Sequence, residues 1–220
     1  MSTPEHSQYD QAPVAYHHWY YERLVWRTTT WLGVPILKSV SDMWNYQEII
    51  TDLRPSLVVE FGTFMGGSAL FFATVMEKLC DDYIVFTVDI NRRQVRDEAL
   101  AHERIEVFTA SSTDDSVRQR LCDLRTAHPG PVFAILDSDH TETHVLGELE
   151  LLRTVLARGD YLVVEDTNLN GHPVLPGCGP GPHEALERFL SEHPGEFLQD
   201  REREGKFGFT FAPDAFLVRL

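Results

Sequence analysis

The sequence predicts an α/β protein built on an open, mostly parallel sheet of seven strands. The first observation is a set of short runs that are almost entirely apolar, which is typical of strands buried on both faces of a parallel sheet. Four runs are clear, at 57–62, 84–90, 132–137 and 161–166. A fifth run, at 105–110, is weaker. The second observation is helical periodicity between the runs, at 68–79, 93–102, 114–127 and 141–157. Strands that alternate with helices indicate repeated βαβ units.

The C-terminal part departs from this alternation. After a helix predicted at 183–192, the segments 196–203 and 207–220 have strand character, with Gly205 at the break and no helix expected between them. We therefore predict a closing antiparallel pair, with an antiparallel last strand at the edge of the sheet.

One segment is predicted to be a loop. Residues 167–182 contain four glycines and four prolines, which is incompatible with a regular helix or strand. The segment directly follows the carboxyl end of a predicted strand, where open α/β sheets bind their ligands.

Residues 1–54 precede the alternating region and contain all four tryptophans. We predict an N-terminal helical extension here and a single compact unit over 55–220. The extension is either a helical layer on the sheet, or a lid or subunit contact, since aromatic residues are enriched at interfaces and pockets. We expect a homo-oligomer.

Composition excludes several classes of partner. The 220 residues carry 34 acids against 19 Lys and Arg, a net charge of −15, so neither nucleic acid nor a polybasic membrane contact is expected. The longest apolar run, 69–76, is far shorter than the roughly 20 residues of a membrane span. Three scattered cysteines indicate reduced thiols, and the first ten residues lack the features of a secretory signal. We expect a cytoplasmic protein.

A glycine turn follows the first predicted strand and has the form E-x-G-x-x-x-G-G-S. It comprises Glu60, Gly62, Gly66 and Ser68. Glycine allows a tight turn with close backbone approach to a ligand, and the helix start beyond it favours anionic groups. An acid two residues before the turn suits a ligand with a positive amine, although a purely structural βα turn remains an alternative. The GxGxxG, P-loop and GxSxG patterns are absent.

Asp89 ends the second predicted strand. An acid at this point binds ribose hydroxyls in dinucleotide folds, and the alternative is a helix N-cap. Together with the glycine turn, it resembles the Rossmann-like class I methyltransferases, which use S-adenosylmethionine (SAM). The resemblance implies that the turn faces the methionine part of SAM, that Asp89 holds the ribose and that Ser111 lies near the adenine.

Acidic residues cluster where the fourth and fifth predicted strands end. They are Asp137, Asp139, Glu165 and Asp166. Neighbouring strands lie about 4.8 Å apart, so these carboxylates converge if the two strands are adjacent. A hard divalent cation relieves the resulting repulsion, and oxygen ligands suit Mg²⁺. The alternatives are helix N-caps and solvated loop acids.

Residues 31–189 resemble the cephalosporin hydroxylase/rhamnosyl O-methyltransferase family. The resemblance is carried by WLGVPILKSVSDMWNYQEII, ILDSDHTETHVLGELELL, GDYLVVEDT and GCGPGP. It implies a SAM- and Mg²⁺-dependent enzyme that methylates a hydroxyl, and it assigns Asp139, Glu165 and Asp166 to the metal. Asp137 is then given to the methionine amine. Catechol-type O-methyltransferases place the first metal ligand at the position of Asp137, so this exchange stays open.

A proton acceptor is expected next to the metal. His140 adjoins Asp139 and is the first choice for the base, and His144, four residues later on the same helical face, is the second. The expected substrate is a small hydroxylated acceptor, namely a rhamnosyl glycoside in natural-product or antibiotic biosynthesis. The alternatives are a role in cephem methoxylation or a non-enzymatic SAM-fold partner.

Overall fold

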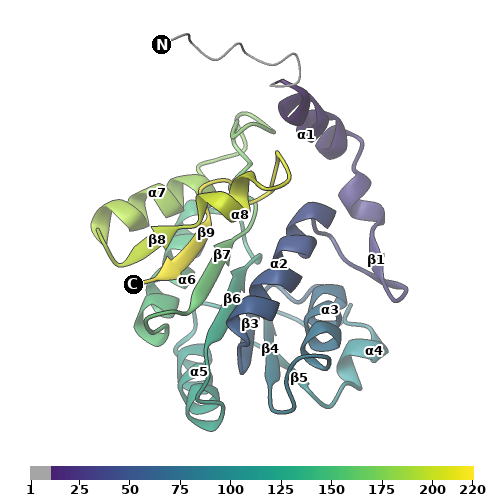
Figure 1. The fold of residues 1–220 in the computed structure, drawn as a ribbon, viewed down its shortest axis with the longest axis vertical. Coiled ribbons are helices and arrows are strands. Elements are labelled where there is room, and N and C mark those ends of the chain that lie inside the picture. The colour runs from purple at the N-terminus through teal and green to yellow at the C-terminus, as the bar shows by residue number, and fades with distance from the viewer. Residues whose placement is uncertain (1–10) are drawn as a thin grey trace.

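A computed structural model describes residues 11–220, so the first ten residues, on which the prediction about a secretory signal rests, lie outside it. Seven strands form one sheet in the order β5-β4-β3-β6-β7-β9-β8 (Figure 1). Their bounds are β3 Leu57–Phe61, β4 Ile84–Asp89, β5 Ile105–Thr109, β6 Val132–Leu136, β7 Tyr161–Val164, β8 Phe197–Gln199 and β9 Phe216–Arg219. This confirms the predicted seven-stranded α/β fold.

β3, β4, β5, β6 and β7 are parallel to one another. A helix after each strand carries the chain back, so the next strand runs in the same direction. In register, Phe61 of β3 faces Val88 of β4 on one side and Leu136 of β6 on the other. β9 pairs antiparallel with both β7 and β8, as predicted for the closing pair. The chain reverses its strand order beside β3, so the loops after β3 and β6 meet at the switch point where such sheets bind ligands.

Helices cover both faces of the sheet (Figure 1). One layer contains α2 Val40–Leu53, α3 Gly67–Met76 and α4 Asp97–Leu100, and the other contains α5 Asp115–Ala127, α6 Glu142–Val155 and α7 Pro182–Glu192. Every residue of β3, β6 and β7 is buried. This double burial explains why their sequences are continuously apolar rather than alternating.

The structure corrects two details of the prediction. A short helix, α8 Arg201–Gly205, lies between β8 and β9, and its start is capped by the side chain of Asp200, which accepts from the backbone N–H of Arg203. The strands are therefore shorter than the predicted 196–203 and 207–220. The helix predicted at 93–102 is reduced to α4, because Arg96 donates its N–H to the carbonyl of Met65 and is extended rather than helical.

The N-terminal segment is only partly helical. It contains α1 Ala12–Glu22, a 3-10 turn η1 Val25–Thr28, a hairpin of β1 Thr30–Trp31 and β2 Val34–Pro35, and then α2. α1 stands at one end of the molecule, away from the sheet layers (Figure 1). The hairpin packs closely on the start of α3, since a Cβ on Gly67 would lie 2.2 Å from the carbonyl oxygen of Pro35. Among residues 11–220, no helix is both long and apolar enough to cross a membrane.

Candidate active site

The glycine turn after β3 lies against the loop after β6. Gly62 has a φ of +104°, and a Cβ there would lie 1.9 Å from the carbonyl oxygen of Asp137. Only glycine fits both the backbone conformation and the space. The N–H of Asp137 also donates to the carbonyl of Phe61 at 2.8 Å. The two loops are thus joined through their backbones.

One cavity, of about 480 Å³, lies beside this turn and collects several predicted cofactor residues. It is lined by Gly62, Asp89, Ser111, Asp139 and His144, among others. Asp89 Oδ2 accepts from the N–H of Phe64 at 2.9 Å, so this carboxylate and the turn are held together. The ribose role of Asp89 stays a prediction, and the structure places its carboxylate in the lining of this cavity.

A second cavity, of about 380 Å³, shares Asp137 and Ser138 with the first. Ser68, at the start of α3, lines it together with Lys38, His140 and Asp166. Gly66 initiates α3 with a φ of +84°. The predicted glycine-turn and acidic motifs therefore meet in two adjoining cavities at the carboxyl ends of the strands.

Lys38, in the loop between β2 and α2, reaches the centre of the acidic group. It is 2% exposed, and its Nζ lies 2.6 Å from Asp137 Oδ2 and 3.0 Å from Glu165 Oε1. Burial lowers the pKa of Lys38, but the charges of Asp137 and Glu165 outweigh this and raise the pKa well above its usual value. Burial raises the pKa of Asp137, but Lys38 and His140 together outweigh burial, and the pKa lies below its usual value.

Glu165 is buried at the end of β7 and has a second partner. The hydroxyl of Tyr46, on α2, donates to Glu165 Oε1 at 2.6 Å. Burial raises the pKa of Glu165 in spite of Lys38. Glu60, at the end of β3, is also fully buried, and burial raises its pKa to about 7. Its Oε1 atom has no hydrogen-bond partner within the described part of the chain.

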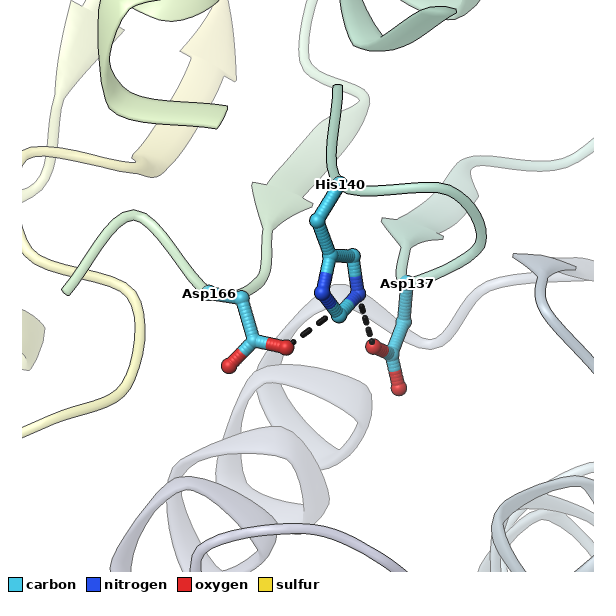
Figure 2. Close-up of side chains that lie close together, drawn as sticks. All are labelled: Asp137, His140 and Asp166. Carbon is cyan, nitrogen blue, oxygen red and sulfur yellow. Dashed lines mark ion pairs between the residues drawn. The ribbon is translucent and has the colours of Figure 1, made fainter. Parts of the chain in front are cut away.

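His140 lies between two carboxylates, as Figure 2 shows. Its Nε2 is 3.2 Å from Asp166 Oδ2 and 3.5 Å from Asp137 Oδ1. Burial lowers the pKa of His140, but the hydrogen bond to Asp137 and the charge of Asp166 prevail and raise it to about 9. Burial raises the pKa of Asp166 to about 7. One ligand atom from each of Asp137, His140 and Asp166 lies within 4.8 Å of the others, which is close enough for a shared cation.

Asp139 lies apart from this group. Its side chain is exposed, and its Oδ1 accepts from the N–H of Thr141 at 2.9 Å, just before α6. It lines the 480 Å³ cavity rather than the one with Asp166. The structure therefore brings Asp137, and not Asp139, together with Asp166, which was the alternative left open by the sequence.

His144 belongs to a separate polar network around Glu148 on α6. Glu148 is 0% exposed and accepts hydrogen bonds from the hydroxyls of Ser112, after β5, and Ser138, after β6. His144 Nε2 lies 2.8 Å from the hydroxyl of Ser112, and the hydrogen bond with Glu148 raises the pKa of His144. The network fixes two loops that line the 480 Å³ cavity.

Sequence reasoning missed three buried polar residues of this site: Lys38, Tyr46 and Glu148. Lys38 has one signal in retrospect, because it is the only charged residue in the stretch LGVPILKSV. Tyr46 and Glu148 have the spacing of ordinary helix residues, and only the tertiary packing shows that they face Glu165 and the two serines.

The sheet order, with its antiparallel strand between two others and its glycine turn at the switch point, defines a Rossmann-like class I methyltransferase fold. Within that class, the chain belongs to the family described as rhamnosyl O-methyltransferase/CmcI, whose model matches residues 23–220. This confirms the family resemblance noted in the sequence.

Similar proteins agree with that assignment. Rhamnosyl O-methyltransferases of Mycobacterium tuberculosis and Mycobacterium leprae are 51% and 52% identical over 210 residues, which is 96% of this chain and 86% and 91% of theirs. A solved structure of CmcI, described as its Mg-SAM form, superposes with a TM-score of 0.71 at 19% identity, covering 88% of this chain and 77% of that one. The latter likeness concerns the fold.

Proposed function

We propose that this protein transfers a methyl group from SAM to a hydroxyl of a rhamnosyl glycoside, with Mg²⁺ as the metal. The observation that carries the proposal is the grouping of Asp137, His140 and Asp166 beside the glycine turn. The mycobacterial relatives, which are named rhamnosyl O-methyltransferases, support the acceptor. The Mg-SAM form of CmcI supports the cofactors.

The residues around the glycine turn fit SAM. The acid Glu60 offers an unpartnered buried oxygen, Oε1, to the positive amine of the methionine part. This replaces Asp137 in that role, since Asp137 is turned toward Lys38 and His140. Gly62, Gly66 and Ser68 form the turn and the helix start, while Asp89 and Ser111 line the cavity for the ribose and adenine.

The donor set also fits Mg²⁺. Asp137 and Asp166 present carboxylate oxygens within reach of one cation, and a hard cation prefers such ligands. Glu165 Oε1 is held by Lys38 and Tyr46, so Glu165 stays a proposed ligand that the family resemblance implies. We favour Asp137 over Asp139 as the first ligand. When bound, Mg²⁺ would supply Lewis acidity that lowers the pKa of an acceptor hydroxyl.

His140 is the proposed base. Its Nε2 faces the carboxylates from the loop after β6 and lines the 380 Å³ cavity. Because the charges of Asp137 and Asp166 raise its pKa, the pKa falls toward the ordinary value when these charges are neutralised. The ring can then accept the proton of the hydroxyl. His144 is held by Ser112 and Glu148, so we place it among the positioning residues.

Three broader expectations from the sequence stay proposals. We propose that residues 1–54 act as an extension of a catalytic unit formed by 55–220. We also propose a homo-oligomer and a cytoplasmic location.

A direct assay tests the function. The purified chain is incubated with SAM, Mg²⁺ and 4-nitrophenyl α-L-rhamnopyranoside, and products are followed by mass spectrometry. We expect a mono-methylated glycoside with stoichiometric S-adenosylhomocysteine (SAH), and loss of turnover in excess EDTA that Mg²⁺ restores. Full turnover in EDTA would overturn the metal, and binding of SAH without methylation of any rhamnoside would overturn the acceptor.

A further inference from the structure

Three aromatic side chains line the same cavity as the carboxylates and His140. Tyr21 lies in the last turn of α1, Trp26 lies in η1, and Phe211 lies in the loop before β9. Their ring centroids are 5.5 to 6.4 Å apart, and Phe211 meets both partners edge-on. We call Tyr21, Trp26 and Phe211 the aromatic wall. The wall combines segments from the two ends of the chain.

Two contacts hold the aromatic wall. The guanidinium of Arg27, which also lines the cavity, lies 5.0 Å from the centre of the Trp26 ring. The N–H of Phe211 donates to the buried carboxylate of Asp42 at 2.8 Å. Burial, followed by the charge of Asp166, raises the pKa of Tyr21 to about 12, so its hydroxyl stays protonated near the acidic group. The contacts with Arg27 and Asp42 hold the rings in this arrangement.

A cavity with rings on one part of its lining and carboxylates on another suits an amphipathic ligand. A 6-deoxyhexose has this character, because its ring C–H groups and its methyl group are apolar while its hydroxyls are polar. The faces of the rings can bury such apolar surface, while the Trp26 Nε1–H, which has no hydrogen-bond partner among the described residues, leaves one donor for a sugar hydroxyl. A hexose with a hydroxyl at C6 would instead bring a polar group against the rings.

We infer that the aromatic wall is the subsite that selects a 6-deoxyhexose acceptor, with Trp26 as the main specificity-determining residue. The inference rests on the proposed function, since it assumes a glycoside acceptor in this cavity. It adds that the N-terminal extension takes part in substrate selection. Other rings of α1, such as Trp19, stack on Tyr16 and do not line this cavity.

Two probes isolate the subsite. Methyl α-L-rhamnopyranoside and methyl α-L-mannopyranoside differ only by the hydroxyl at C6. Binding to the SAH-loaded protein is measured by calorimetry, and kcat and KM are measured for methyl transfer. For the wild type we expect a preference for the rhamnoside of about tenfold or more, as for other single-group differences in apolar pockets.

The variants are Trp26→Ala, Trp26→Phe and the matched control Trp19→Ala. Trp26→Ala should lose most of the preference, mainly through the KM of the rhamnoside, while SAH affinity stays within about twofold. Trp26→Phe keeps a ring and should retain part of the preference, and Trp19→Ala should retain all of it. Melting curves identify any variant that does not fold, in which case Trp26→Phe alone decides the comparison with Trp19→Ala.

Failure of this inference differs from failure of the proposed function. If the wild type methylates the rhamnoside and the Trp26 variants keep the wild-type preference, the subsite is overturned and the function stands. If the wild type binds the rhamnoside selectively through Trp26 but never methylates it, the subsite stands and the function is overturned. If the SAH-loaded protein binds neither glycoside, both are overturned.

Discussion

The ammonium group of Lys38 lies 3.0 Å from the buried carboxylate of Glu165, and both side chains are almost completely shielded from solvent. The pair joins the loop before α2 to the end of β7. Removing one member of such a pair leaves an uncompensated buried charge, which costs far more than the intact pair contributes. We therefore expect the Lys38–Glu165 ion pair to affect both the free energy of unfolding and the binding of Mg²⁺.

Lys38→Met should lower the free energy of unfolding by about 3–5 kcal/mol in urea titrations without metal. Lys206→Met is the matched control, because Lys206 pairs with Glu48 at the surface and its loss should cost less than about 1 kcal/mol. Added Mg²⁺ should raise the melting temperature of Lys38→Met more than that of the wild type. Equal stability of Lys38→Met and wild type would contradict the importance of the buried pair.

The two candidate first ligands can be separated by Mg²⁺ titration. Asp137 lies with His140 and Asp166, whereas Asp139 is exposed and bonded to the backbone of Thr141. Asp137→Asn should weaken Mg²⁺ binding by at least about tenfold in calorimetry, and Asp139→Asn should change it by less than about threefold. The reverse ranking would return the first ligand to Asp139.

Glu148 should influence SAM affinity without touching it. In Glu148→Ala the hydroxyls of Ser112 and Ser138 lose their shared acceptor, and the two loops beside the 480 Å³ cavity lose their connection. We expect SAH binding to weaken by about tenfold or more, since each lost buried partner costs about 1–3 kcal/mol. Glu150→Gln, on the same helix but in surface ion pairs, should bind SAH like the wild type.

Asp42 should make stability depend on pH. Burial raises its pKa from 3.8 to about 7 in the folded protein. As the pH rises from about 4 to about 7, the unfolded chain releases this proton while the folded chain retains it, so the free energy of unfolding falls. Between pH 5 and pH 8, the wild type should therefore lose more stability than Asp42→Asn in urea titrations. Parallel pH profiles for the two proteins would show that Asp42 does not retain the proton.

Much of the fold could be predicted because the strands are buried on both faces. β3, β6 and β7 are apolar throughout and flanked by helical periods, so their sequences alone fix their type. The C-terminal region was predicted less well. Three residues of β8 and five of α8 are too few to show a period, and the cap by Asp200 is a local signal that the strand-like pattern obscured.

The sequence predicts which acidic residues form the candidate site, but not which of their carboxylates face one another. Strand ends place Asp137, Glu165 and Asp166 at one edge, which follows from parallel topology. The loop after β6 decides which carboxylate faces Asp166. In this loop Asp139 accepts a hydrogen bond from the backbone N–H of Thr141 and does not lie with Asp166. Lys38 is distant in sequence from all of these acids, so only the folded chain reveals its ion pairs.

The carbonyl of Asp137 fills the space beside Gly62, and this contact fixes how the methyl donor lies relative to the acceptor oxygen in the proposed reaction. The turn that we propose for the methyl donor and the carboxylate that we propose for the metal are parts of one rigid backbone unit, with no side chain between them. The donor and the activated oxygen would thus be brought to their reacting distance by the fold itself. A mutation that adds even one methyl group at Gly62 should misalign the two partners of the reaction together.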